Sequence, residues 1–212
     1  MKKIIMAIVA TVMALPTFAQ YSSGDFSFDK SSLYYGARIG LNMSGIGGDE
    51  SMGTKTGMTL AGVVGMRVSN ALFLESGLYY TQRGGKENGT TAGLNYLEIP
   101  ALIKYGIQVS DEIAVIPFVG PYFSYAISGR IKNKDLGVDQ SSFRDGSFKH
   151  PDMGFKFGVG ADYNKLYLEI AYQAGVANIS KADPVTAHGH AFNINFGVNF
   201  ETSAGFSPST EP

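Results

Sequence analysis

The chain has 212 residues, a formal net charge of −1, no cysteine and no tryptophan. The lack of cysteine excludes disulfides, thiolate metal sites and a lipidated N-terminal cysteine. The near-zero charge provides no field that would attract nucleic acid. Charged residues make up only 17% of the chain, below the ~25% of an ordinary soluble domain, so we expect a sparsely charged surface.

The first 19 residues have the three parts of a secretory signal peptide. Lys2 and Lys3 form the basic region, residues 4–15 the apolar region and Thr17-Phe18-Ala19 the cleavage site. The apolar region is far shorter than the ~20 residues that a membrane-spanning helix needs. We therefore predict export, with cleavage after Ala19 and a mature N-terminal segment over residues 20–32.

From residue 33 onward, apolar and polar residues alternate with period two, and no segment shows the 3.6-residue period of a helix. In "HAFNINFGVNF", for example, Phe192, Ile194 and Phe196 share one face, and Asn193 and Asn195 share the other. Such alternation is typical of β-strands. The pattern predicts strands over residues 33–43, 56–68, 71–83, 94–106, 114–129, 152–163, 166–178 and 190–200.

The connections between these strands alternate in length. The short connections carry turn-forming residues and cover 69–70, 107–113 and 164–165. The longer connections are polar and cover 44–55, 84–93, 130–151 and 179–189. This alternation predicts an all-β fold, an eight-stranded antiparallel up-and-down β-barrel over residues 33–200.

The two faces of the strands distinguish a soluble barrel from a transmembrane one. A soluble lipocalin-like barrel needs a wet, charged outer face, whereas the polar face here is mostly Gly, Ala, Ser and Asn, which suits a narrow lumen. The other face is nearly free of charge, and its aromatic residues gather near the strand ends, as at the two interfaces of a membrane. We therefore predict a transmembrane β-barrel in the outer membrane.

The strand "LNYLEIPALIKYGI" at 94–107 carries Glu98 and Pro100 near its centre, which is unusual in a sheet. Parity places both residues on the lumen face, where a carboxylate can find a cationic partner. Pro100 has no N–H for the ladder, and the sheet can accommodate it in two ways: by a local β-bulge, or by a seam with the following strand that opens more easily.

Several segments resemble the PorT-like family of outer-membrane β-barrel proteins. They are "LESGLYYTQRGG" at 74–85, "NYLEIPALIKY" at 95–105, "IPFVGPYFSYAISG" at 116–129 and "LEIAYQAGVANIS" at 168–180. The resemblance implies a barrel in a Gram-negative outer membrane, and a role associated with protein secretion for the eponymous member. It also implies assembly by machinery that reads the last aromatic residue of the barrel, here Phe200. A polar tail over 201–212 follows, which we expect to be disordered.

Charged residues on the lumen face are expected to pair with one another and plug the barrel, because an eight-stranded barrel is only wide enough for its side chains. Arg38, Glu75, Glu98 and Lys156 fall near mid-height by position along the strands. Arg67, Lys104, Asp162 and Glu169 fall nearer the short turns. Each set balances two cations against two anions.

The sequence suggests a non-enzymatic barrel without a cofactor, whose loops bind a surface or secretion-system protein. The candidate loop residues are His150, His188, His190, Phe143 and Phe148. Two alternatives stay open: a lipid-modifying hydrolase that combines a histidine with Ser180 and Asp183 or Asp152, or a zinc site made by the three histidines. A small-solute channel is a further alternative. We expect a monomer in contact with outer-membrane lipid, and no nucleic-acid partner.

Overall fold

The computed structural model describes residues 33–49, 51–69, 71–133, 137–143, 148–163, 165–181 and 184–201. The predicted signal peptide, the 20–32 segment and residues 202–212 of the predicted tail lie outside the described residues. No helix in the described part of the chain is long and apolar enough to cross a membrane.

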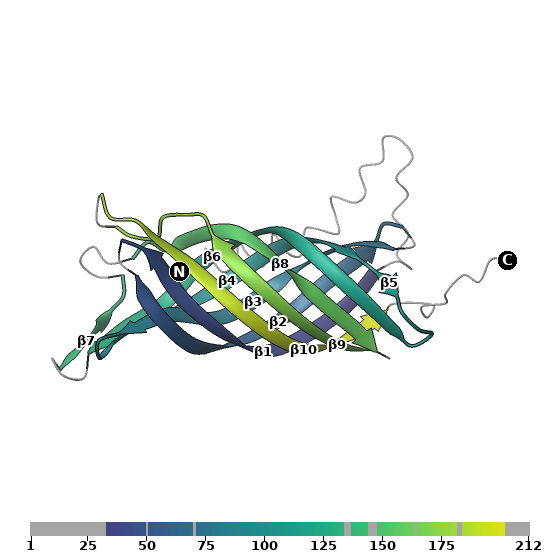
Figure 1. Cartoon of the computed structure of the whole chain (residues 1–212), viewed down its shortest axis with the longest axis horizontal. Helices are drawn as coiled ribbons and strands as arrows, with labels where there is room; N and C mark the ends of the chain where they lie inside the picture. Colours follow the sequence, from purple (N-terminus) through teal and green to yellow (C-terminus); the bar gives the residue numbers. More distant parts are fainter. Residues whose placement is uncertain are drawn as a thin grey trace.

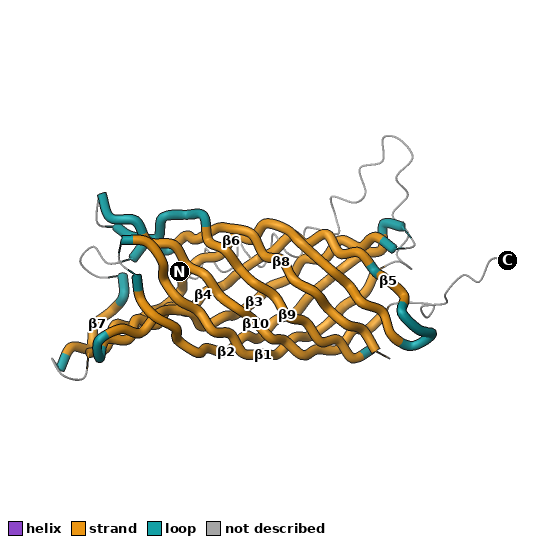
Figure 2. The backbone as a smooth tube through the Cα atoms, in the orientation of Figure 1, coloured by secondary structure: helices purple, strands orange, loops and turns teal. Residues whose placement is uncertain are grey.

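Eight long antiparallel strands close into a barrel, with the strands strongly tilted to its axis (Figures 1 and 2). They are β1 (Leu33–Gly48), β2 (Met52–Arg67), β3 (Leu72–Glu87), β4 (Thr90–Tyr105), β6 (Ile113–Asn133), β8 (Pro151–Tyr163), β9 (Leu166–Gly175) and β10 (Ala187–Glu201). The ring closes because β1 pairs with both β2 and β10. This confirms the predicted all-β, eight-stranded antiparallel barrel.

Two short strands pair with β6, one at each end of the barrel (Figure 1). β5 (Ile107–Gln108) pairs with the start of β6 at the end that carries the short turns. β7 (Val138–Ser141) pairs with the last residues of β6 at the other end, which we call the long-loop end. The long-loop end corresponds to the extracellular side in barrels of this kind, and the short-turn end to the periplasmic side.

Side chains alternate between a buried inner face and an exposed apolar outer face. In β1, the inward-facing Arg38 is 1% exposed, whereas the outward-facing Ile39 and Leu41 are 53% and 58% exposed. The same contrast runs along β8, where Lys156 is buried and Phe155 is 52% exposed. Water would disfavour such a ring of exposed apolar side chains, but the hydrocarbon of a bilayer accommodates it.

Two of the four predicted long loops are wrong. Residues 44–55 and 84–93 mostly continue the flanking strands, and the chain reverses close to Asp49 and at Asn88-Gly89. Asn88 and Gly89 have φ angles of 45° and 76°, as a two-residue hairpin with a type I′ turn requires. The alternating pattern was hidden because these strand ends project past the apolar band and are rich in Gly, Thr and Lys.

The ladders of β4 are interrupted at Pro100 on the β3 side and opposite Pro121 on the β6 side. On the β3 side, the described pairs pass from Ser76↔Ala101 directly to Tyr79↔Glu98. On the β6 side, they pass from Pro100↔Tyr122 to Ile103↔Val119. The β-bulge in this pairing lies elsewhere, between Asn95 and Tyr96. The bulge that was predicted at Pro100 is therefore not there, and the interrupted ladders leave the second explanation, a seam that opens more easily, as a prediction.

Candidate functional site in the barrel lumen

Glu75 is the centre of a charge cluster near the short-turn end of the lumen. Its Oε1 lies 2.6 Å from Nζ of Lys104, and its Oε2 lies 3.4 Å from Nη2 of Arg38. The hydroxyl of Tyr34 donates a hydrogen bond of 2.8 Å to the same Oε2. These groups come from β1, β3 and β4, where inward parity brings them together. One buried carboxylate is thus shared by two cations.

Lys156 and Glu169 form a second buried pair, from the neighbouring strands β8 and β9. Nζ of Lys156 lies 3.2 Å from Oε1 of Glu169, and Nδ2 of Asn195 donates to that oxygen at 2.7 Å. The ammonium group also lies 4.5 Å from the ring centroid of Tyr79, a favourable cation–π position. Tyr79 of β3 is 1% exposed, so its ring is buried beside this pair.

Arg83 joins two carboxylates nearer the long-loop end. Its Nη2 pairs with Glu98, and its Nη1 lies 3.3 Å from Oδ2 of Asp152. Gln173 donates a hydrogen bond of 2.7 Å to the other oxygen of Glu98. The guanidinium carbon lies 5.2 Å from the ring centroid of Tyr122. These contacts explain the central Glu98, because it holds an arginine that projects from the adjacent strand.

The structure brings most of the predicted lumen residues into ion pairs, but not in the predicted layers. Glu75 pairs with Lys104, and Lys156 with Glu169, so residues assigned to different heights meet. The reason is the stagger between neighbouring strands of a tilted barrel. Arg67 and Asp162 lie near the short turns and are only partly buried.

Both of these residues contact other side chains. The guanidinium carbon of Arg67 lies 5.6 Å from the ring centroid of Phe73. Asp162 accepts a hydrogen bond of 2.8 Å from Asn199.

The sequence-based network omitted Arg83 and gave Asp152 a different role. Arg83 shares the inward parity of Glu75, Tyr79 and Thr81, but it is the last residue of a strand that was predicted to end there. Asp152 was considered only as a hydrolase carboxylate. Its even parity with Lys156 was the available signal for a lumen position. With these two included, the buried ion pairs join four cations to four carboxylates.

An apolar cap closes the lumen at the long-loop end. We use this name for a set of mutually packed buried residues: Ile46, Ala92, Leu94, Tyr96, Ala126, Phe148, Ile179 and Ala187. Phe148 comes from the β6–β8 connection and Ile179 from the β9–β10 connection. The backbone N–H of Lys149 donates to the Ile179 carbonyl at 2.7 Å, which ties the two connections together over the mouth.

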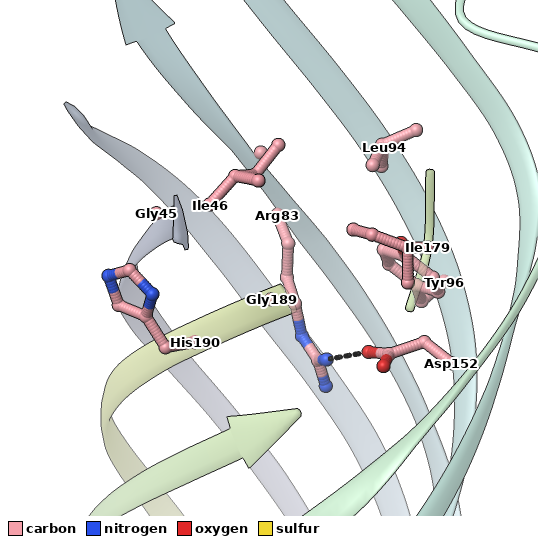
Figure 3. Close-up of a pocket in the computed structure, with 10 residues that line it drawn as sticks. Gly45, Ile46, Arg83, Leu94, Tyr96, Asp152, Ile179, Gly189 and His190 are labelled. Carbon is pink, nitrogen blue, oxygen red and sulfur yellow. Dashed lines mark hydrogen bonds and ion pairs between the residues drawn. The ribbon is translucent and has the colours of Figure 1, made fainter. Parts of the chain in front are cut away.

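A small cavity remains between the cap and the Arg83 cluster. Its free volume is ≈ 10 Å³, about the space of one water molecule. Figure 3 shows Arg83 extending past His190 toward Asp152, with Ile46 and Leu94 on the cap side. Nε of Arg83 and Oδ1 of Asp152 have no hydrogen-bond partner among the described residues.

The candidate loop residues serve mainly internal contacts. Phe148 is 6% exposed, so it packs in the cap and does not present a surface anchor as expected. Phe143 stacks on His150 with ring centroids 4.1 Å apart. Nδ1 of His150 contacts the Ala126 carbonyl at 2.7 Å, and Nδ1 of His188 contacts the Ala177 carbonyl at 3.0 Å.

These positions bear on the two alternatives for the histidines. Among the described residues, no group of three or more His, Cys, Asp or Glu side chains is placed to hold a metal ion. Ser180 is 2% exposed and accordingly shielded from solvent. Asp183, the other carboxylate of the hydrolase alternative, lies outside the described residues.

Comparison with known proteins agrees with the fold. The family described as "Outer membrane protein beta-barrel domain" matches residues 18–181. Among solved structures, Neisserial surface protein A is similar with a TM-score of 0.50 and 16% identity, over 78% of this chain and 97% of that one.

Two further structures are less similar. Ail of Yersinia pestis has a TM-score of 0.45 and 14% identity, over 80% of this chain and 99% of that one. OprG of Pseudomonas aeruginosa has a TM-score of 0.46 and 13% identity, over 81% and 98%. No protein with a curated function matches the sequence significantly.

Proposed function

Because this chain belongs to the outer membrane protein beta-barrel domain family, we propose that it is a non-enzymatic integral barrel whose lumen is closed to solutes. The observation that carries the proposal is the set of buried ion pairs that crosses the lumen. Arg83, Glu98 and Asp152 join β3, β4 and β8 across the interior. A second crossing, by Arg38, Glu75 and Lys104, lies closer to the periplasmic end.

The physical case for closure rests on width and charge. An eight-stranded barrel has an interior that side chains fill, and conduction needs a continuous aqueous path. In the part of the chain that the structure describes, each buried cation lies against a carboxylate, so none of them is available to bind a permeating anion. The apolar cap adds a third barrier, because Phe148 and Ile179 cover the extracellular mouth.

The proposed role is that of a rigid platform at the cell surface. Export by the N-terminal signal peptide and recognition of Phe200 by the barrel assembly machinery are part of this proposal. So is the narrower PorT-like assignment, which the "NYLEIPALIKY" segment supports. The extracellular connections would contact a surface or secretion-system protein, with Phe143 as the remaining aromatic candidate of the β6–β8 connection.

A planar-bilayer recording of the refolded wild-type barrel tests closure. We expect no stable ohmic conductance. The variant Phe148→Ala removes part of the cap and should also stay closed, since the ion pairs below it are intact. Stable conductance of the wild type would overturn the proposal. Conductance of Phe148→Ala alone would instead assign closure to the cap and contradict the role given to the ion pairs.

The partner proposal needs a separate experiment. Proteins cross-linked to the wild-type barrel in membranes are compared with those cross-linked to a variant lacking residues 134–147. We expect at least one protein to be lost from the variant. Recovery of the same proteins in the same amounts would exclude this connection as the contact site.

A further inference from the structure

The outward positions of β2, β3, β4 and β6 change chemistry in a fixed order toward the extracellular end. The last apolar residues are Met58, Tyr80, Leu97 and Tyr125, with the half-buried bulge residue Ile127 following Tyr125 on β6. The next are uncharged and polar: Thr56, Gln82, Asn95 and Ser128. Asn95 and Ser128 share a hydrogen bond of 2.8 Å. Basic residues follow on β2, β3 and β6, whereas β4 continues with Gly93 and Thr91. This is the order in which a bilayer changes from hydrocarbon to head group.

Strand register places these basic residues on one face. Lys86 of β3 pairs with Thr91 of β4, and Thr91 pairs with Lys132 of β6. Directly paired residues in an antiparallel sheet project from the same side. Arg130 is two residues before Lys132 and therefore shares its side. Arg130 and Lys132 do not face the lumen, because Ile131, which lies between them, packs against the apolar cap.

Lys55 of β2 reaches the same area. Its Cε lies 3.7 Å from the position that a Cβ on Gly93 would occupy, and Gly93 pairs with Arg130. Because Gly93 has no side chain, the aliphatic part of Lys55 can pack against the backbone of β4 at this position. Lys55 lies within an irregular part of β2, where the register with β3 shifts between Thr54 and Thr59. We call Lys55, Lys86, Arg130 and Lys132 the basic patch.

Three residues of the basic patch are exposed and Lys55 is half-buried, and the patch carries an excess of positive charge. The side chains of Arg130 and Lys132 are 68% and 58% exposed. Asp139 of β7 lies 3.6 Å from Arg130 and 3.9 Å from Lys132. Among the described residues, this carboxylate pairs with two of the four cations, and alternation turns the nearby Glu87 toward the other face of β3. Exposed pairs of this kind are weak and exchange readily with other anions.

We propose that the basic patch binds the phosphate-bearing head group of an anionic lipid in the outer leaflet. The patch faces sideways, directly beyond the apolar band, so a lipid that packs its chains on Leu97 and Tyr125 brings its head group to the cations. Arg130 supplies the planar fork that matches phosphate oxygens, and the lysines supply point charges. This inference is independent of the closed lumen.

Native mass spectrometry of the refolded barrel tests the proposal. The protein is released from zwitterionic micelles that contain phosphatidic acid or, in a parallel sample, phosphatidylcholine. We expect retention of phosphatidic acid in preference to phosphatidylcholine. The double variant Arg130→Gln/Lys132→Gln should bind phosphatidic acid about 30-fold more weakly, since each Lys or Arg near an anionic surface contributes about 1 kcal/mol.

The matched control is Lys149→Gln/Lys165→Gln, which removes two exposed lysines outside the patch. It should retain phosphatidic acid as the wild type does. Equal loss in both double variants would show a general effect of net charge and overturn the site. Equal retention by the wild type and the patch variant would also overturn it.

Two further measurements use the wild type alone and do not depend on folding of a variant. Retention of phosphatidic acid should fall as sodium chloride is raised, because exposed charges are screened. Insensitivity to salt would contradict an electrostatic site. Displacement of the lipid by an equal concentration of inorganic phosphate would show that the patch recognises free phosphate, and the lipid assignment would then be wrong.

Discussion

Oγ of Ser76 donates a hydrogen bond of 2.7 Å to the carbonyl oxygen of Pro100, at the place where the β3–β4 ladder is interrupted. Proline has no N–H to offer the ladder, and an unpaired carbonyl is costly in lipid. The serine hydroxyl therefore replaces one of the missing backbone bonds. On the other side of β4 the ladder is also interrupted, next to Pro121, so this section of wall has fewer backbone bonds than its neighbours.

The wall around Pro100 should open locally more often than the rest of the barrel. In detergent, amide hydrogen exchange at Ala101 and Leu102 is expected to be faster than at Leu168 and Ile170, which lie in the uninterrupted β9–β10 ladder. Replacing Ser76 by Ala should accelerate exchange near Pro100 further. Uniform protection across β4 and β9 would show that the missing bonds do not weaken the seam.

Removal of the Glu98 carboxylate should destabilise the folded barrel. Glu98→Ala leaves Arg83 with one carboxylate instead of two, and breaking a buried pair costs about 3–5 kcal/mol. The temperature at which the barrel unfolds, read as a mobility shift on a gel, should fall. The control Glu112→Ala alters an exposed turn residue and should leave this temperature unchanged. An unchanged temperature in Glu98→Ala would remove Glu98 from the network.

A methyl group at Gly120 should be far less tolerated than one at Gly62. A Cβ on Gly120 would overlap the backbone carbonyl oxygen of Ala101 on β4, whereas a Cβ on Gly62 would meet nothing within 4 Å. Backbone atoms cannot move aside without disturbing the sheet. We expect Gly120→Ala to reduce the refolding yield or the unfolding temperature, and Gly62→Ala to match the wild type. Equal behaviour would contradict the close approach of β4 and β6.

The apolar cap should loosen when Phe148 is truncated. Loss of a buried phenylalanine side chain costs about 3–5 kcal/mol in a packed core. In Phe148→Ala, the N–H of Lys149, which donates to the Ile179 carbonyl across the mouth, should exchange faster, and so should the N–H of Ile179, which donates to the Ala187 carbonyl. Phe123→Ala removes a 45% exposed, lipid-facing ring and serves as the control. If the two variants protect these amides equally, Phe148 does not hold the connections together.

The contact between Asp49 and Thr186 should respond to acid. Asp49 accepts hydrogen bonds from the backbone N–H of Thr186 at 2.9 Å and from its hydroxyl at 2.8 Å. These bonds, the backbone one first, hold the pKa of Asp49 below its ordinary value of 3.8. A lowered folded-state pKa means that this contact stabilises the folded state above the unfolded pKa and is lost as pH falls through the folded one.

The Thr186 amide proton resonance reports this titration by nuclear magnetic resonance. Its midpoint should lie below pH 3.8 in the wild type. Asp49→Asn keeps an acceptor oxygen but cannot titrate, so its Thr186 resonance should be independent of pH in this range. A midpoint above the ordinary carboxyl value would show that the hydrogen bonds do not favour the ionised form.

The register of side chains could be predicted from the sequence, but the ends of the strands could not. Period-two alternation placed Arg38, Glu75 and Glu98 inside because one face of each strand must meet lipid. Beyond the apolar band that constraint disappears, since both faces of a strand end can meet water. The predicted strand thus stopped at Arg83, and the hairpin around Asn88 was taken for a loop.

The sequence also could not predict which lumen charges pair with each other. The sequence supplied the parity of Glu98 but not the identity of its partner. That partner depends on the stagger between β3 and β4, which brings Arg83 to Glu98 and, across the lumen, to Asp152. The same stagger mixes the two expected layers, because Lys104 and Glu169 of the lower set pair with Glu75 and Lys156 of the mid-height set. Phe148 was assigned to the surface because its connection is polar, whereas the folded chain turns it over the mouth.

The sequence by itself determined the closed eight-stranded barrel, the inward and outward faces and the lipid-compatible band, because each follows from local alternation and from the need to satisfy the backbone in lipid. Only the tertiary structure decided which charges meet, how Phe148 and Ile179 cap the lumen, and how Lys55, Arg130 and Lys132 gather on one outer face. Those contacts join residues far apart in the chain, and their geometry is set by strand tilt and register, which no local pattern encodes.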